Sequence, residues 1–119
     1  MVILFSADHY FENGIPITGF PMYVKRVTTA LAQLGHMPII VACGKRNQHY
    51  FEDGVEIYFV RCQVGLTKVK SWTLLKEALY RSKLINQKIR EIARTRNIDI
   101  IQFTSIQGTG FFTMERFRL

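Results

Sequence analysis

The sequence lacks the features that place a chain across a membrane or outside the cell. None of its apolar runs approaches the roughly 20 residues that a helix needs to cross a bilayer. The first residues carry neither the basic region nor the longer apolar segment of a secretory signal. Cysteine is scarce, and Cys43 and Cys62 stand too far apart for a metal motif or a disulfide framework. We therefore expect a cytoplasmic protein with two reduced, buried thiols.

Glycine-rich phosphate loops are absent as well. A dinucleotide fingerprint needs G-x-G-x-x-G directly after a strand, whereas the first loop of this chain offers only Gly14 and Gly19. No P-loop sequence occurs in the 119 residues. These absences argue against NAD binding of the Rossmann type and against nucleotide hydrolysis. The sequence also contains no internal repeat and no low-complexity segment.

The chain does contain a strand, a helix and a second strand close to its start. Residues 2–7 form a continuous apolar run, which is typical of a strand covered on both faces. Pro21 suits the first turn of a helix, and Gly35 ends that helix as a left-handed cap. Residues 38–42 form the second strand, so the unit predicts a parallel crossover. With 48% hydrophobic residues the chain can bury a core, and its length allows one domain at most.

The rest of the sequence continues the alternation of strands and helices. Residues 55–61 predict a third strand, residues 71–96 a long helix beginning at Ser71, and residues 98–103 a fourth strand. Residues 50–54 indicate a short hairpin or connector, and residues 111–119 the opening of another helix. We expect an α/β fold with a Rossmann-like open parallel sheet of about four strands, in the order 3-2-1-4, and helices on both faces. The fourth strand would then be an exposed edge open to self-association.

Positive charge is concentrated in the long helix and the residues before it. The chain has a net charge of +7, and between Leu66 and Arg96 nine basic residues meet only two acidic ones. A basic amphipathic helix suits an anionic membrane surface, although a simply solvated face explains the same pattern. Nucleic acid is not favoured, because no nucleic-acid-binding fold or stacking platform is visible. The residues expected to face a membrane are Lys76, Arg81, Lys83, Lys88, Arg90 and Arg94.

Four short motifs follow one another at characteristic intervals. They are Thr18-Gly19 before the first helix, Gly35-His36 after it, Asp53-Gly54-Val55 at the third strand and Asn97-Ile98-Asp99 at the fourth. Their order and spacing resemble those of family 4 glycosyltransferases of the GT-B fold. That family has a Gly-Gly pair, a Gly-His pair, an Asp-Gly-Val element and an aspartate before a hydrophobic strand at these places.

The resemblance implies that residues 1–119 are a partial N-terminal, acceptor-side Rossmann-like domain that lacks the donor-binding second domain. Completed by that domain, the protein would move a sugar from a nucleotide-sugar donor to a hydroxyl acceptor. The chain alone would be inactive. Nucleotide sugar would be a co-substrate, and we expect no cofactor and no metal.

The same resemblance assigns substrate-binding residues but no catalytic residue. Thr18 and Gly19 would lie against the donor diphosphate, since glycine beside a helix N-terminus exposes amides to phosphate. Four residues at strand ends would shape the acceptor side: Asp8, His9, Gln102 and Thr104. The sequence departs from the family at Thr18, where the first glycine stands. It departs again where the family often has His-x-His and this chain has Gln102-Phe103-Thr104.

A second function class remains open. The chain is also compatible with a small flavodoxin-like binding or interaction module that works as a subunit, paired through its exposed sheet edge.

Overall fold

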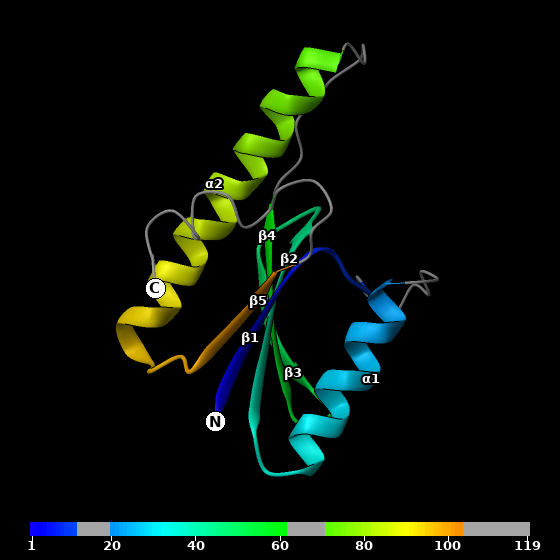
Figure 1. Cartoon of the computed structure of the whole chain (residues 1–119), viewed down its shortest axis with the longest axis vertical. Coiled ribbons are helices and arrows are strands. Elements are labelled where there is room, and N and C mark those ends of the chain that lie inside the picture. The colour runs from blue at the N-terminus through cyan, green and yellow to red at the C-terminus, as the bar shows by residue number, and fades with distance from the viewer. Residues whose placement is uncertain (12–19, 62–70, 104–119) are drawn as a thin grey trace.

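The computed structural model describes residues 1–11, 20–61 and 71–103 (Figure 1). The elements follow in the order β1 (Val2–His9), α1 (Phe20–Gln33), β2 (Met37–Gly44), β3 (Gln48–Glu52), β4 (Val55–Arg61), α2 (Ser71–Thr95) and β5 (Ile100–Phe103). Thr18, Gly19, Cys62, Thr104 and the helix expected over residues 111–119 lie outside the described residues.

The five strands form one mixed sheet in the order β3-β4-β2-β1-β5. The α/β class that we expected is confirmed, whereas a four-stranded, wholly parallel sheet of order 3-2-1-4 is wrong. Strands β4, β2, β1 and β5 run parallel, and β3 is added outside β4 as an antiparallel edge strand. The first crossover, from β1 through α1 to β2, has the parallel form that the sequence predicted.

The extra strand arises from a tight turn between β3 and β4. Asp53 and Gly54 are the two turn residues, with φ angles of 52° and 77°. Positive φ at both positions matches the two-residue hairpin turn that follows the twist of its strands. A Cβ atom at Gly54 would come within 3.1 Å of the Ala32 Cβ atom, so the turn also lies close against α1. The expected hairpin or connector over residues 50–54 is therefore the end of β3 and the turn that joins it to β4.

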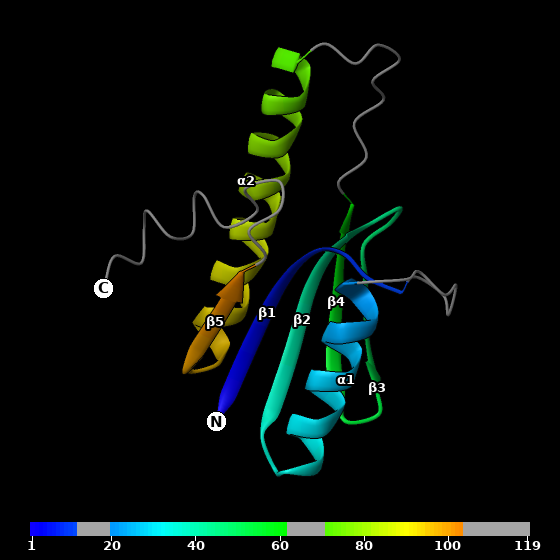
Figure 2. The same cartoon turned by 45° about the vertical axis from the view of Figure 1, so that its right-hand side comes forward.

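In the described part of the chain, α1 covers one face of the sheet and α2 covers the other (Figure 2). Alternate residues of β1, β2 and β4 pack under α1, among them Phe5, Ile40 and Phe59. The intervening residues Leu4, Ile39 and Val41 pack under α2, against Ile85, Ile89 and Ile92. Burial on both faces explains why β1 and β2 read as continuous apolar runs. The largest of these side chains are fully buried, so they supply most of the hydrophobic stabilisation.

Helix α1 ends as the sequence predicted. Gly35 has a φ of 89°, its N–H donates to the Ala32 carbonyl at 3.1 Å, and the His36 N–H donates to the Leu31 carbonyl at 3.0 Å. This pair of hydrogen bonds is a Schellman cap, which satisfies carbonyls that the helix leaves open. The chain can therefore turn at once into β2.

Helix α2 is longer than the sheet that it covers. Its carboxyl-terminal half packs on the sheet through Ile85, Ile89 and Ile92. Figures 1 and 2 both show its amino-terminal half extending past the end of the sheet. The amino-terminal half of α2 therefore lies near the ends at which the parallel strands finish.

Candidate functional site at the carboxyl edge of the sheet

The two ends of the parallel strands have different roles in this class of fold. We call the end where β1, β2, β4 and β5 finish the carboxyl edge, and the end where they start the amino edge. From β1 the chain passes to β2 on one side, and after α2 it returns to β5 on the other side of β1. Open α/β sheets bind ligands outside the carboxyl edge at such a change of direction. A ligand site is therefore expected at the carboxyl edge between β1 and β5.

Three predicted site residues reach this region. Asp8 and His9 are the last two residues of β1, and Gln102 is the exposed penultimate residue of β5. Phe5 is in register with Gln102, so Asp8 and His9 continue β1 beyond that pair. The backbone of the three residues thus lies on neighbouring strands at one edge. Thr18, Gly19 and Thr104, outside the described residues, are not part of this geometry.

The start of the first loop is held by two buried aromatic rings. Tyr10 and Phe11 follow β1, are 4% and 8% exposed, and stack edge to face with ring centroids 5.4 Å apart. The Lys25 ammonium lies 5.3 Å from the centre of the Phe11 ring, a cation–π contact. Burial raises the pKa of Tyr10, and the charges of Glu52, Tyr50 and Asp53 raise it further. Tyr10 therefore keeps its proton at neutral pH. The two buried rings hold the chain in place directly after β1.

Polar side chains enter the interface between α2 and the sheet near the carboxyl edge. Ser82 and Asn86 are buried on α2, and Ser6 on β1 is 1% exposed. Ser6 alternates with Leu4, so its side chain lies on the α2 face of the sheet. Within the described part of the chain, the Ser6 hydroxyl has no hydrogen-bond partner. The sequence analysis missed these residues, although a serine inside the run VILFSAD was a signal.

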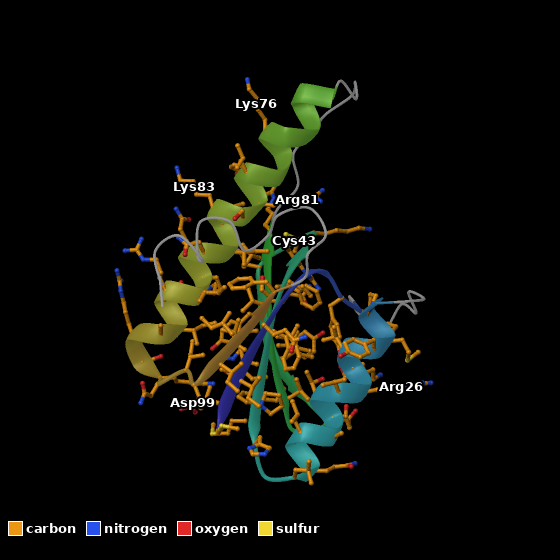
Figure 3. The ribbon with its side chains drawn as sticks, in the orientation of Figure 1. Arg26, Cys43, Lys76, Arg81, Lys83 and Asp99 are labelled. Carbon is orange, nitrogen blue, oxygen red and sulfur yellow. The ribbon has the colours of Figure 1, made fainter. Side chains whose placement is uncertain are left out.

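Cations gather around the carboxyl edge. Lys45 and Arg46 directly follow β2, and Arg61 is the last residue of β4. The side-chain carbonyl oxygen of Asn47 accepts a hydrogen bond from the Arg61 N–H at 2.9 Å, which fixes the turn after β2 against the end of β4. Figure 3 shows Arg81 on α2 near the end of the sheet, above Cys43 of β2. Sequence analysis assigned the excess charge to the long helix and the residues before it.

A different polar cluster closes the amino edge. The Glu56 carboxylate is 4% exposed and accepts hydrogen bonds from both terminal nitrogens of the Arg96 guanidinium. Arg96 Nη2 lies 2.7 Å from Oε1. Tyr58 donates its hydroxyl to Oε1 at 2.7 Å, and His49 Nε2 lies 2.8 Å from the same oxygen. The His49 and Tyr58 rings stack 4.1 Å apart. Because the carboxylate is filled by protein groups, this cluster stabilises the fold and offers no binding position.

The basic residues of α2 do not share one environment. Lys76, Lys83 and Arg94 are exposed, whereas Arg81 and Arg90 are half-buried. Lys88 is half-buried too, 3.3 Å from a Glu91 oxygen and 5.6 Å from the centre of the Tyr58 ring. Burial raises the pKa of Tyr58, with the Glu91 charge as the second cause. Only part of the predicted basic face is therefore turned to solvent.

The described residues bring together no group of three or more histidine, cysteine, aspartate or glutamate side chains that could hold a metal ion. In the same residues, no helix combines the length and the apolar character needed to span a membrane. Comparisons with protein-family models, with curated proteins and with solved structures found no match for the chain.

Proposed function

We propose that the chain is the N-terminal, acceptor-side part of a family 4-like glycosyltransferase of the GT-B fold. The observation that carries the proposal is where the resembling motifs lie. Gly35-His36 forms the cap of α1, Asp53-Gly54 forms the turn before β4, and Asp99 joins β5 to β1. All three are at junctions that a shared Rossmann-like backbone would require. In this proposal β3 is an addition at one edge of a parallel unit.

The proposed reaction needs a second, donor-binding domain. The acceptor hydroxyl oxygen would attack the anomeric carbon of the donor sugar, whose bond to the nucleotide diphosphate breaks. The hydroxyl proton would pass to the released diphosphate, directly or through water. Negative charge then grows on the leaving diphosphate, and oriented amides stabilise it. Thr18 and Gly19 are proposed for this role because they precede α1, which has no acidic residue in its first turn. Asp8, His9, Gln102 and Thr104 are proposed for the acceptor side.

A titration with nucleotide sugars, in the presence of a candidate donor-binding second half, tests the proposal. We expect amide shifts from a uridine or guanosine diphosphate sugar to concentrate at Tyr10, Phe11 and the first turn of α1. The variant Gly19→Val should weaken binding by about fivefold or more, the effect of losing one hydrogen bond of about 1 kcal/mol. Gly14→Val, in the same loop, is the matched control. Equal loss in both variants, or shifts centred on the amino edge, would contradict the proposal.

Peripheral membrane binding is proposed as an accompanying property. The amino-terminal half of α2 extends past the sheet and exposes Lys76 and Lys83. Each basic residue near an anionic surface contributes on the order of 1 kcal/mol. Sedimentation with phosphatidylserine-rich vesicles should show binding that added salt reverses, and the double variant Lys76→Gln/Lys83→Gln should bind less. Equal binding to neutral vesicles would rule the property out.

β5 is an edge strand of the sheet formed by the described residues, and this favours a second candidate, an interaction module that pairs with another subunit. β5 has β1 as its neighbour on one side, and Ile100 at its start is 45% exposed. Unpaired edge strands are templates for association. Sedimentation velocity distinguishes the candidates. A stable dimer without nucleotide-sugar binding would favour the module, whereas a monomer would leave this candidate without support.

A further inference from the structure

Acidic and basic side chains are unevenly distributed between the two edges of the sheet. Glu52 and Asp53 form the end of β3 and its turn, Glu56 is the second residue of β4, and Asp99 precedes β5. All four acids therefore lie at the amino edge. Lys45, Arg46 and Arg61 lie at the carboxyl edge, where Asp8 is the acidic residue contributed by the described strands. The carboxyl edge thus carries more positive charge than the amino edge, where Arg96 offsets Glu56.

The backbone adds to this difference. Helix α1 begins at the carboxyl edge, and a helix N-terminus carries about half a positive charge. Its first turn contains no acidic residue to offset that charge, and Lys25 and Arg26 follow in the next turn. Summed fields of this kind concentrate anions at one surface of a protein.

Lys45, Arg46 and Arg61, here called the cationic turn, are held together by strand pairing. Arg61 is in register with Gly44, the residue before Lys45, on strands that are about 4.8 Å apart. The Asn47 side chain then ties the turn to the Arg61 N–H. Among the residues that the structure describes, neither Arg46 nor Arg61 has a carboxylate partner, and both are exposed.

We infer that the cationic turn is a binding position for a diphosphate group of a small molecule. Arginine presents a planar set of donors that matches phosphate oxygens, so Arg46 and Arg61 together suit the two phosphates of a diphosphate. A membrane surface fits less well, because the turn between β2 and β3 has no apolar residue to insert. Nucleic acid fits less well because exposed Phe51 lies at the far end of β3, away from the turn.

This position uses none of residues 12–19, and it does not depend on a glycosyltransferase function. The test titrates the labelled chain with inorganic pyrophosphate, and with uridine diphosphate against uridine. Pyrophosphate and uridine diphosphate should shift the amides of Lys45, Arg46 and Arg61, whereas uridine should not. The double variant Arg46→Gln/Arg61→Gln should weaken pyrophosphate binding by at least about tenfold, as expected for two charge-assisted hydrogen bonds.

The matched control removes the same charge elsewhere. Lys83→Gln/Arg94→Gln lies on exposed positions of α2 and should change the dissociation constant by less than about twofold, through long-range charge only. The inference is overturned if the control loses as much affinity, or if pyrophosphate does not saturate at millimolar concentration. It is also overturned if the parent chain binds anionic vesicles but not pyrophosphate, and the Arg46→Gln/Arg61→Gln variant loses the vesicle binding. The nucleotide-sugar titration is read at Tyr10 and α1, so either test can fail alone.

Discussion

The amino and carboxyl edges of the sheet treat their polar groups in opposite ways. At the amino edge Glu56 is filled by Arg96, His49 and Tyr58, and Asp99 accepts from the Val2 N–H at 2.8 Å. At the carboxyl edge a buried serine hydroxyl lies without a partner in the described structure, and basic side chains gather around the strand ends. Hydrogen bonds and ion pairs at one edge of a sheet can therefore stabilise the fold, while polar groups at the other edge stay available to bind ligands. The predictions below test that division.

The largest effect is expected from breaking the Glu56–Arg96 pair. Arg96→Met should lower the free energy of unfolding by about 2–4 kcal/mol, because Glu56 stays buried without its cation. This range is below that of a fully buried pair, since the Arg96 side chain is 28% exposed. Urea denaturation followed by circular dichroism measures the change. The neighbouring exposed Arg94→Met should stay within about 0.5 kcal/mol of the parent. An equal loss in both would show that the pair is not what holds this edge.

The turn at Gly54 gives the next largest effect. Gly54→Ala should destabilise by about 2–3 kcal/mol, because it adds a left-handed strain and a methyl group 3.1 Å from the Ala32 Cβ atom. Gly35→Ala is the matched comparison. Gly35 has a similar φ but open space around it, so the loss should be about 1–2 kcal/mol. Thermal unfolding of the two variants measures the difference. Equal losses would mean that the contact with α1 contributes nothing.

Alkaline pH probes the residue that follows β1. The raised pKa of Tyr10 means that the folded chain keeps a proton which the unfolded chain releases above pH 10.0. Stability should therefore be unaffected below that pH and fall above it, by about 1.4 kcal/mol per pH unit for this group. Urea denaturation between neutral and strongly alkaline pH measures the slope. Tyr10→Phe should remove most of it, and an unchanged slope in that variant would show that other groups are responsible.

The smallest effect has the opposite sign. Ser6→Ala removes a buried hydroxyl that has no partner in the described structure, so it should be neutral or stabilise by up to about 1 kcal/mol. A loss of stability, measured by the same denaturation, would mean that the hydroxyl is paired after all. A gain accompanied by weaker ligand binding would mark Ser6 as a group retained for function.

Local patterns predicted much of this fold, and distant pairs did not. The apolar runs of β1 and β2, the cap at Gly35 and the start of α2 at Ser71 each follow from a few adjacent residues. Strand β3 was expected only as a hairpin or connector over residues 50–54. Its five residues are mostly polar or exposed, and they form a strand by pairing with β4 after a two-residue turn. The Glu56–Arg96 pair joins residues 40 positions apart, which no local pattern reveals.

The candidate site was predicted less completely than the fold. Strand ends identified Asp8, His9 and Gln102 as edge residues, since parallel strands finish at the same side of a sheet. The uneven charge distribution could not be seen, because its acids and bases alternate along the sequence and are sorted only by strand direction. Lys45 and Arg46, for example, stand eight or fewer positions from Glu52 and Asp53 in sequence but at the opposite edge of the sheet.

The bonds between Asp99 and Val2 have a consequence for biosynthesis. A ribosome makes β1 first, yet both its outer neighbour β5 and the side chain that binds its first residue come almost a hundred residues later. During most of translation the outer side of β1 therefore has neither its strand partner β5 nor the hydrogen bond to Asp99. Such delays are expected for folds dominated by distant contacts. Chaperone demand, and not only final stability, is set by where that aspartate stands.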